Sequence, residues 1–132
     1  MEQIPILKTG AVLLVSIQED MHDRMAVALR DNLANEIIRT RVRGVLIDLS
    51  GVGLVDSFTV RVLQNMAQVS RMLGAETVLV GMQPPVALTL VEMGLSIPGV
   101  RTALNVDKGM EVLEAALKSK ETASDGSFVR NE

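Results

Sequence analysis

The sequence predicts an α/β fold with a mainly parallel β-sheet and four helices. Short apolar stretches alternate with amphipathic segments in the order β-β-α-β-α-β-α-β-α. Such alternation is typical of parallel sheets with right-handed crossovers. The stretch 44–49, GVLIDL, is almost entirely apolar, as expected of a strand that helices cover on both faces. The 132 residues are enough for one domain with a substantial core.

The first half of the chain contains a hairpin, a helix and a buried strand. The apolar stretches 4–10 and 11–17 are separated by Thr9-Gly10, which predicts a β-hairpin. A helix is expected from about Asp20 to Arg39, because an apolar residue recurs at every fourth position. These residues are Met21, Met25, Leu29, Leu33 and Ile37. The strand at 44–49 follows this helix.

The second half adds three helices and two strands. A helix should begin at Asp56-Ser57 and end at Gly74, followed by a strand at 76–81. The third helix is expected to begin near the two prolines at 84–85 and to stop at Gly94. A weak strand at 100–104 then leads to a last helix, with Asp107 as its expected N-cap. We expect the domain to span residues 1–118, and the polar residues 119–132, which lack periodicity, to form a disordered tail.

Composition excludes several classes of function. The net charge of −3 and the presence of only two aromatic residues, Phe58 and Phe128, argue against nucleic-acid binding. There is no cysteine, and no apolar run approaches the length of a membrane span. The N-terminus also lacks a basic-then-apolar signal pattern. We therefore expect a cytoplasmic protein without disulfide bonds.

Neither catalysis nor a cofactor is expected. His22 is the only histidine and has no second ligand at metal-binding spacing, so no metal site is predicted. Asp48 and Asp56 could be imagined as a carboxylate pair, but no set of nucleophile, base and orienting residue accompanies them. Gly51-x-Gly53 matches neither the dinucleotide nor the Walker fingerprint. These glycines are better explained by a turn that needs positive φ.

The most informative residue is Ser57, at the start of the second predicted helix. The carboxyl ends of the parallel strands should bring together the loops 18–20, 51–57 and 81–85. A phosphate on Ser57 would meet the free N–H groups of the first helical turn, although Ser57 could instead simply cap the helix. Arg61 could pair with that phosphate, pair with Asp56 or remain solvated. Phe58 is either an apolar anchor for a partner or part of the core.

A resemblance to a known family is carried by six stretches, which are 4-IPILK-8, 13-LLVSIQ-18, 44-GVLIDLSGV-52, 55-VDSF-58, 70-SRMLGA-75 and 83-QPPVALTLVEMG-94. Through these stretches the chain resembles the STAS family, the anti-sigma-factor antagonists, over roughly residues 4–118. Within this family the chain is most similar to the RsbS branch, the small scaffolds of the bacterial stressosome. Many family members have a small residue and then glycine after the serine, whereas Phe58-Thr59 stands here, as in that branch.

The resemblance implies a non-enzymatic phosphorylation switch without cofactors. Its partners would be RsbR-like STAS paralogues, an RsbT-like serine/threonine kinase and an RsbX-like phosphatase, in a homodimer and a large assembly. Ser57 would be the phosphoacceptor, with Thr59 or Ser16 as open candidates for a second one. The surroundings of the phosphosite would be Asp48, Gly51, Gly53, Asp56, Phe58 and Arg61. Candidate partner contacts are Thr59, Met82, Gln83 and Pro84.

The same resemblance leaves a second interpretation open. The chain could be a STAS module that binds a small ligand or a nucleotide, or a subunit of a transport complex. A module of that kind should contain a pocket with saturable binding.

Overall fold

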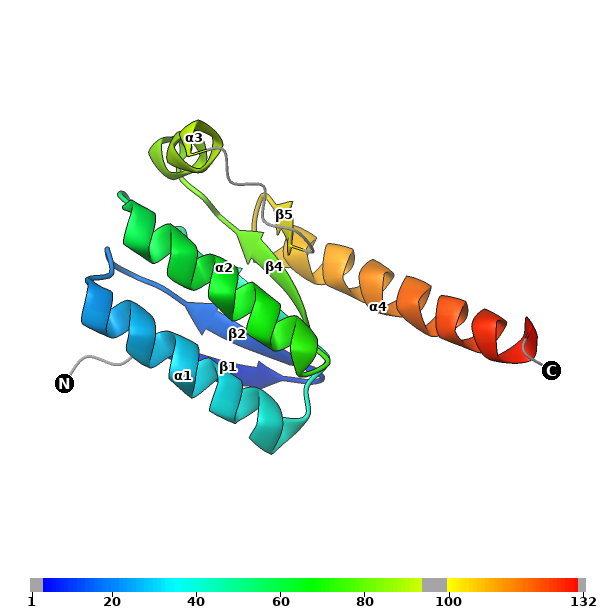
Figure 1. Ribbon diagram of the computed structural model, residues 1–132. Helices are drawn as coiled ribbons and strands as arrows, with labels where there is room; N and C mark the ends of the chain where they lie inside the picture. The colour runs from blue at the N-terminus through cyan, green and yellow to red at the C-terminus, as the bar shows by residue number, and fades with distance from the viewer. Residues whose placement is uncertain (1–3, 94–99, 131–132) are drawn as a thin grey trace.

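A mixed sheet of five strands forms the centre of the molecule (Figure 1). The computed structural model describes residues 4–93 and 100–130. The strand order is β1-β2-β3-β4-β5, with β1 antiparallel to β2 and the other neighbours parallel. The predicted α/β fold and element order are confirmed. The strands are β1 Ile6–Thr9, β2 Val12–Ser16, β3 Gly44–Asp48, β4 Glu76–Val80 and β5 Val100–Ala103.

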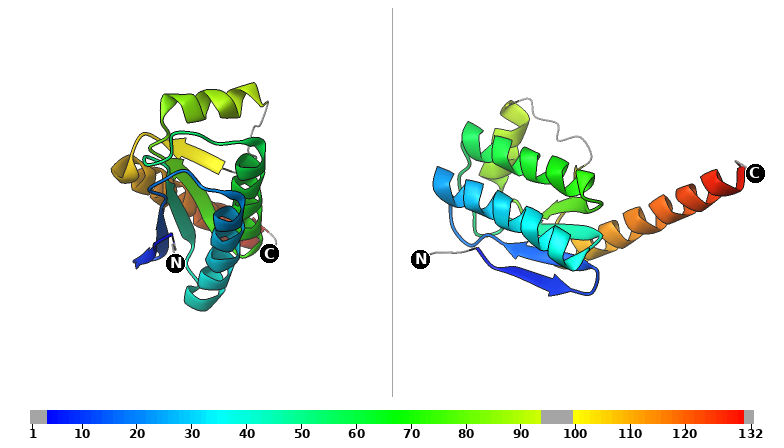
Figure 2. Two further views of the ribbon diagram at one scale, coloured as in Figure 1. Left: turned by 90° about the vertical axis from the view of Figure 1, so that its left-hand side faces the viewer. Right: turned by 60° about the horizontal axis from the view of Figure 1, so that its bottom comes forward.

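Helices cover both faces of this sheet, as the apolar strand at 44–49 predicts. Figure 2 shows α1 and α2 side by side on one face and α4 on the other. Alternate residues of β3 follow this division: Val45 and Ile47 belong to the core under α1 and α2, whereas Leu46 packs with Leu113 of α4. The helices are α1 Asp23–Thr40, α2 Ser57–Met72, α3 Pro84–Glu92 and α4 Val106–Arg130.

The last helix is longer than the sequence predicts. We expected a disordered tail from residue 119, whereas the backbone of α4 continues as a helix to Arg130 and projects beyond the sheet (Figure 1). The described side chains of α4 that pack in the core end at Leu117. Alanine, glutamate and lysine, which favour helix, are frequent between residues 111 and 123 and can carry the helix past the last packed turn.

Candidate functional site

Three loops meet at the carboxyl ends of the parallel strands, as predicted. Asp20, in the loop before α1, accepts hydrogen bonds at Oδ1 from the backbone N–H groups of Gly53 (2.7 Å) and Leu54 (3.2 Å). Gln83, just before α3, donates from Nε2 to the carbonyl of Ser50 at 2.8 Å. The loop between β3 and α2 is therefore held by one side chain from each of its two neighbouring loops.

Gly51 is required by close packing rather than by its backbone angle. A Cβ atom at this position would lie 2.5 Å from the backbone of Gln18, so any side chain would push the two loops apart. Positive φ occurs among the described glycines at Gly10, Gly74 and Gly81, and not at Gly51 or Gly53. The expectation of a positive-φ turn at Gly51 and Gly53 is therefore wrong.

Ser57 is the first residue of α2, and Asp56 is its N-cap. Asp56 has an extended backbone (φ −106°, ψ 176°), and its Oδ1 accepts from the N–H of Thr59 at 2.8 Å. The alternative in which Ser57 itself caps the helix is therefore wrong. Aspartate and serine cap helices about equally well, so the sequence could not separate two adjacent candidates. Ser57 is exposed, and its hydroxyl forms no hydrogen bond to the part of the chain that the structure describes.

The cap also determines the charge beside Ser57. Hydrogen bonds hold the pKa of the Asp56 carboxyl below its usual value; the backbone N–H of Thr59 contributes most and the Thr59 hydroxyl next. Asp56 is consequently ionised at neutral pH and already occupies donors of the first helical turn. A phosphate on Ser57 would meet a neighbouring carboxylate that already accepts from the N–H of Thr59, one of the groups that the sequence analysis expected to be free.

Arg61 lies one turn further along α2. Its side chain is exposed and forms no ion pair with any described residue. In the unphosphorylated protein Arg61 is therefore solvated and does not pair with Asp56. Residues four apart share a helix face, and helical side chains lean toward the N-terminus. Arg61 therefore remains the candidate cation for a phosphate on Ser57.

Phe58 and Thr59 point into the protein. Phe58 is half-buried and packs against the core under α1 and α2. This packing supports its role as part of the core over that of an anchor for a partner. Thr59 is only 2% exposed, so its predicted role as a partner contact is wrong. The same burial removes Thr59 as a second phosphoacceptor, whereas Ser16 is half-buried and remains open.

Asp48 belongs to the opposite side of the sheet. Its Oδ1 accepts from the N–H of Ser50 at 3.0 Å, and its side chain lines a pocket of about 360 Å³ together with residues 104–107 at the start of α4. The alternation of side chains along β3 explains this placement, because Asp48 lies on the same face of the sheet as Leu46. The structure thus does not bring Asp48 and Asp56 together as a carboxylate pair, nor does it place Asp48 beside Ser57 on α2.

The remaining candidates divide between structural and surface roles. The Gln83 amide is engaged with Ser50, Met82 is half-buried, and Pro84 is exposed. Sequence reasoning missed Leu54, whose side chain is 72% exposed in the loop that leads to Ser57. An apolar residue between two turn positions was the available signal.

Within residues 4–93 and 100–130, no cluster of three or more histidine, cysteine, aspartate or glutamate side chains is arranged to hold a metal ion. None of the helices described there is both long and apolar enough to cross a bilayer.

Comparisons with known proteins agree with this architecture. RsbS from Moorella thermoacetica, solved as a variant with glutamate in place of a serine, is 36% identical and superimposes with a TM-score of 0.78. The match covers 89% of this chain and 99% of that one. A chain in a solved structure of the stressosome, described as a signal integration and transduction hub, is 35% identical and superimposes with a TM-score of 0.72. This match covers 86% of the present chain and 98% of the stressosome chain.

Curated relatives lead to the same group. The RsbT co-antagonist protein RsbRA of Bacillus subtilis is 31% identical over 86 residues, which are 65% of this chain. The match spans 31% of RsbRA, so the chain covers about a third of the length of that relative. The family model of the STAS domain matches residues 3–109. The chain belongs to the STAS domain family.

Proposed function

We propose that this protein is a non-enzymatic stressosome scaffold that binds an RsbT-like switch kinase and releases it when Ser57 is phosphorylated. The observation that carries the proposal is the presentation of Ser57. This serine is exposed at the first position of α2, on a loop held by Asp20 and Gln83. A kinase needs an acceptor hydroxyl that it can reach, and the exposed Ser57 meets this condition.

The electrostatics suit a release mechanism. Phosphorylation adds about −1.5 to −2 charges at neutral pH. The ionised carboxylate of Asp56 is adjacent in sequence, and Arg61 is the cation on the same helix face. Because Ser57 is exposed, the fold should tolerate the phosphate while the surface potential changes sharply. One mispaired charge in an interface costs about 2–5 kcal/mol, enough to release a partner.

The relatives supply the proposed partners. The matching RsbR proteins are named RsbT co-antagonists, and a similar chain occurs in the stressosome. We infer that this chain assembles in the cytoplasm with RsbR-like STAS paralogues, as homodimers within a large complex. An RsbX-like phosphatase would remove the phosphate and reset a stress-signalling pathway.

The test is binding of an RsbT-like kinase to the wild type, Ser57→Ala and Ser57→Asp, with ATP-dependent mapping of the phosphorylated residue on the wild type. We expect phosphate on Ser57, retained binding by Ser57→Ala and lost binding by Ser57→Asp. Ser119→Asp is the matched control, because it adds the same charge at an exposed position of α4. Equal binding by Ser57→Asp and Ser57→Ala, or phosphate elsewhere, would overturn the proposal.

A further inference from the structure

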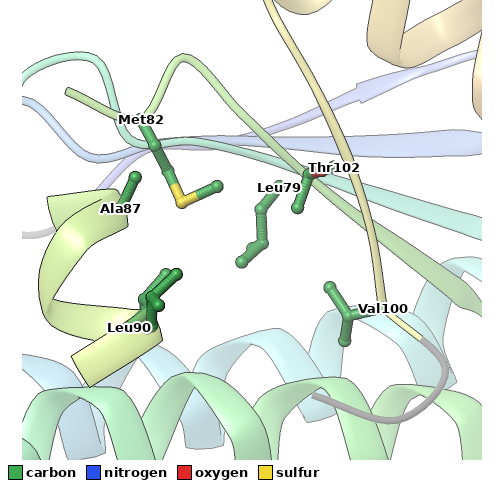
Figure 3. Close-up of a pocket in the computed structure, with 7 residues that line it drawn as sticks. Leu79, Met82, Ala87, Leu90, Val100 and Thr102 are labelled. Carbon is green, nitrogen blue, oxygen red and sulfur yellow. The ribbon is translucent and has the colours of Figure 1, made fainter. Parts of the chain in front are cut away.

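A second cavity lies between α3 and the sheet, and Met82 of the loop before α3 lines it. Its volume is about 230 Å³. Figure 3 shows side chains from β4, α3 and β5 around this space, with the thioether of Met82 extending into it. The lining residues are Leu79, Met82, Ala87, Leu90, Val91, Val100 and Thr102.

The lining of the cavity is apolar and uncharged. Leu79 and Leu90 are 2% and 9% exposed and form its buried wall, whereas Val91 and Thr102 are exposed at its mouth. Among the lining residues that the structure describes, the Thr102 hydroxyl is the one polar side-chain group. A buried water needs two to four polar partners, so water is held weakly here and a ligand displaces it at little cost.

We propose that this cavity is a binding site for a compact, uncharged apolar molecule, either aromatic or branched aliphatic. An apolar cavity of about 150 Å³ in another protein binds benzene, so the larger volume here accommodates a single ring or a small bicyclic one. Met82 adds an adaptable side chain whose sulfur packs favourably against aromatic rings. Burial of a carboxylate or ammonium group here would be disfavoured, because none of the described lining side chains carries an opposite charge.

The position of the cavity connects it to the phosphoacceptor loop. Met82 lines the cavity, and the next residue, Gln83, holds the carbonyl of Ser50. A ligand that displaces Met82 therefore acts one residue away from a contact that positions the loop of Ser57. This consequence for the switch rests on the proposed function, whereas binding in the cavity does not.

The experiment is a titration of the ¹³C-methyl-labelled full chain with benzene and with indole, followed by NMR. We expect saturable shifts of the Leu79, Met82 and Leu90 methyl signals, with little change at the exposed Met72 at the far end of α2. Benzoate, which adds a carboxylate to the same ring, should leave all of these signals in place. Absence of saturable shifts with benzene and indole, or equal shifts with benzoate, would overturn the proposal.

A substitution that fills the cavity supplies the matched control. Ala87→Leu places a larger side chain in the space and should abolish the shifts, whereas Ala115→Leu makes the same change at an exposed position of α4 and should preserve them. Unchanged binding to a folded Ala87→Leu variant overturns the assignment. If that variant does not fold, the wild-type titration alone decides the question.

The coupling to the switch is read separately, from the backbone amide signals of Ser50 and Gly51 and from the rate of Ser57 phosphorylation. We expect both to change when indole saturates the cavity. Methyl shifts without any response of the loop amides or of the rate would overturn the coupling while the binding site stands. Failure of Ser57 phosphorylation in the absence of any ligand would instead overturn the proposed function.

Discussion

The carboxylate of Asp20 accepts a hydrogen bond from the backbone N–H of Gly53 at 2.7 Å, across 33 residues of sequence. The same oxygen accepts from Leu54, so a single side chain holds two successive peptide groups of the loop before Ser57. Because the helix start follows this loop directly, the position of Ser57, the candidate phosphoacceptor, depends on a residue in a different loop. Asp20 is therefore a positioning residue for the candidate phosphosite.

Replacement of Asp20 should loosen this loop without unfolding the protein. Asp20→Ala leaves the N–H groups of Gly53 and Leu54 without their acceptor and should lower the free energy of unfolding by about 1 kcal/mol. Hydrogen exchange of these two amides should accelerate. Asp20→Asn keeps an acceptor oxygen and should restore most of the protection. Glu19→Ala, at the exposed neighbouring position, is the control, and equal exchange in both alanine variants would contradict the role of Asp20.

The cap of α2 should give a pH-dependent contribution to stability. Asp56→Ala should lower the free energy of unfolding by about 1 kcal/mol at pH 7. The folded-state pKa of Asp56 lies below its unfolded value, so this stabilisation is complete above the unfolded pKa and is lost as the pH falls through the folded pKa. The difference between wild type and variant should therefore shrink below about pH 4. Urea unfolding at several pH values measures it.

Asp56→Asn provides the comparison for this measurement, because asparagine caps helices about as well as aspartate but does not ionise. Because neither replacement ionises, the stability of Asp56→Asn relative to Asp56→Ala should remain nearly constant with pH, whereas both variants should change relative to wild type as Asp56 becomes protonated. A pH-independent difference between Asp56→Ala and wild type would show that the charge of Asp56 does not stabilise the folded state.

The fold could be predicted because the spacing of apolar residues identified the helices and strands, and their alternation along the chain indicated a parallel sheet. The four-residue spacing of Met25, Leu29, Leu33 and Ile37 matches α1, and the apolar strand at 44–49 indicates a sheet covered on both faces. Convergence of the loops followed from the strand direction alone. The details of the site depended on tertiary contacts, such as the approach of Gln18 to Gly51, which no local pattern encodes.

The position of Asp48 was nevertheless accessible from the sequence. Side chains alternate between the two faces of a strand, so Asp48 must share the face of Leu46 and turn away from the helices that cover Ile47. Applying that alternation would have removed Asp48 from the surroundings of Ser57. The choice between Asp56 and Ser57 as the cap could not be made in this way, because both are good caps at adjacent positions.

Phe58 should contribute to stability more than to partner binding. Its ring is half-buried against the core, so Phe58→Ala should lower the free energy of unfolding by roughly 2 kcal/mol, less than the full loss for a buried ring. Chemical denaturation measures the change. Phe58→Leu keeps apolar volume and should recover more than half of the loss. A change below about 0.5 kcal/mol for Phe58→Ala would instead indicate a surface anchor.

Leu54 should show the opposite behaviour. Its side chain is 72% exposed in the loop that leads to Ser57, so Leu54→Ser should change stability by less than about 0.5 kcal/mol. If the proposed kinase docks beside Ser57, the same variant should weaken kinase binding about tenfold or more in a pull-down or calorimetric titration. Met72→Ser is the control, because Met72 is 86% exposed at the other end of α2. Equal binding by both variants would exclude Leu54 from the interface.

The opposing charges beside Ser57 should be visible in the titration of the phosphoserine itself. A free phosphoserine loses its second proton near pH 6, and a neighbouring cation lowers that pKa while a neighbouring carboxylate raises it. Arg61→Ala should therefore raise the phosphate pKa, and Asp56→Asn should lower it, in ³¹P NMR titrations of the phosphorylated protein. Arg71→Ala, in the last turn of α2, is the control and should leave the value unchanged.

If Arg61→Ala has no more effect than Arg71→Ala, Arg61 does not pair with the phosphate, and the negative charge at the helix start remains unneutralised by α2. In that case repulsion between the phosphate and Asp56 alone would have to release the kinase, and Asp56→Asn should then weaken the effect of phosphorylation on kinase binding.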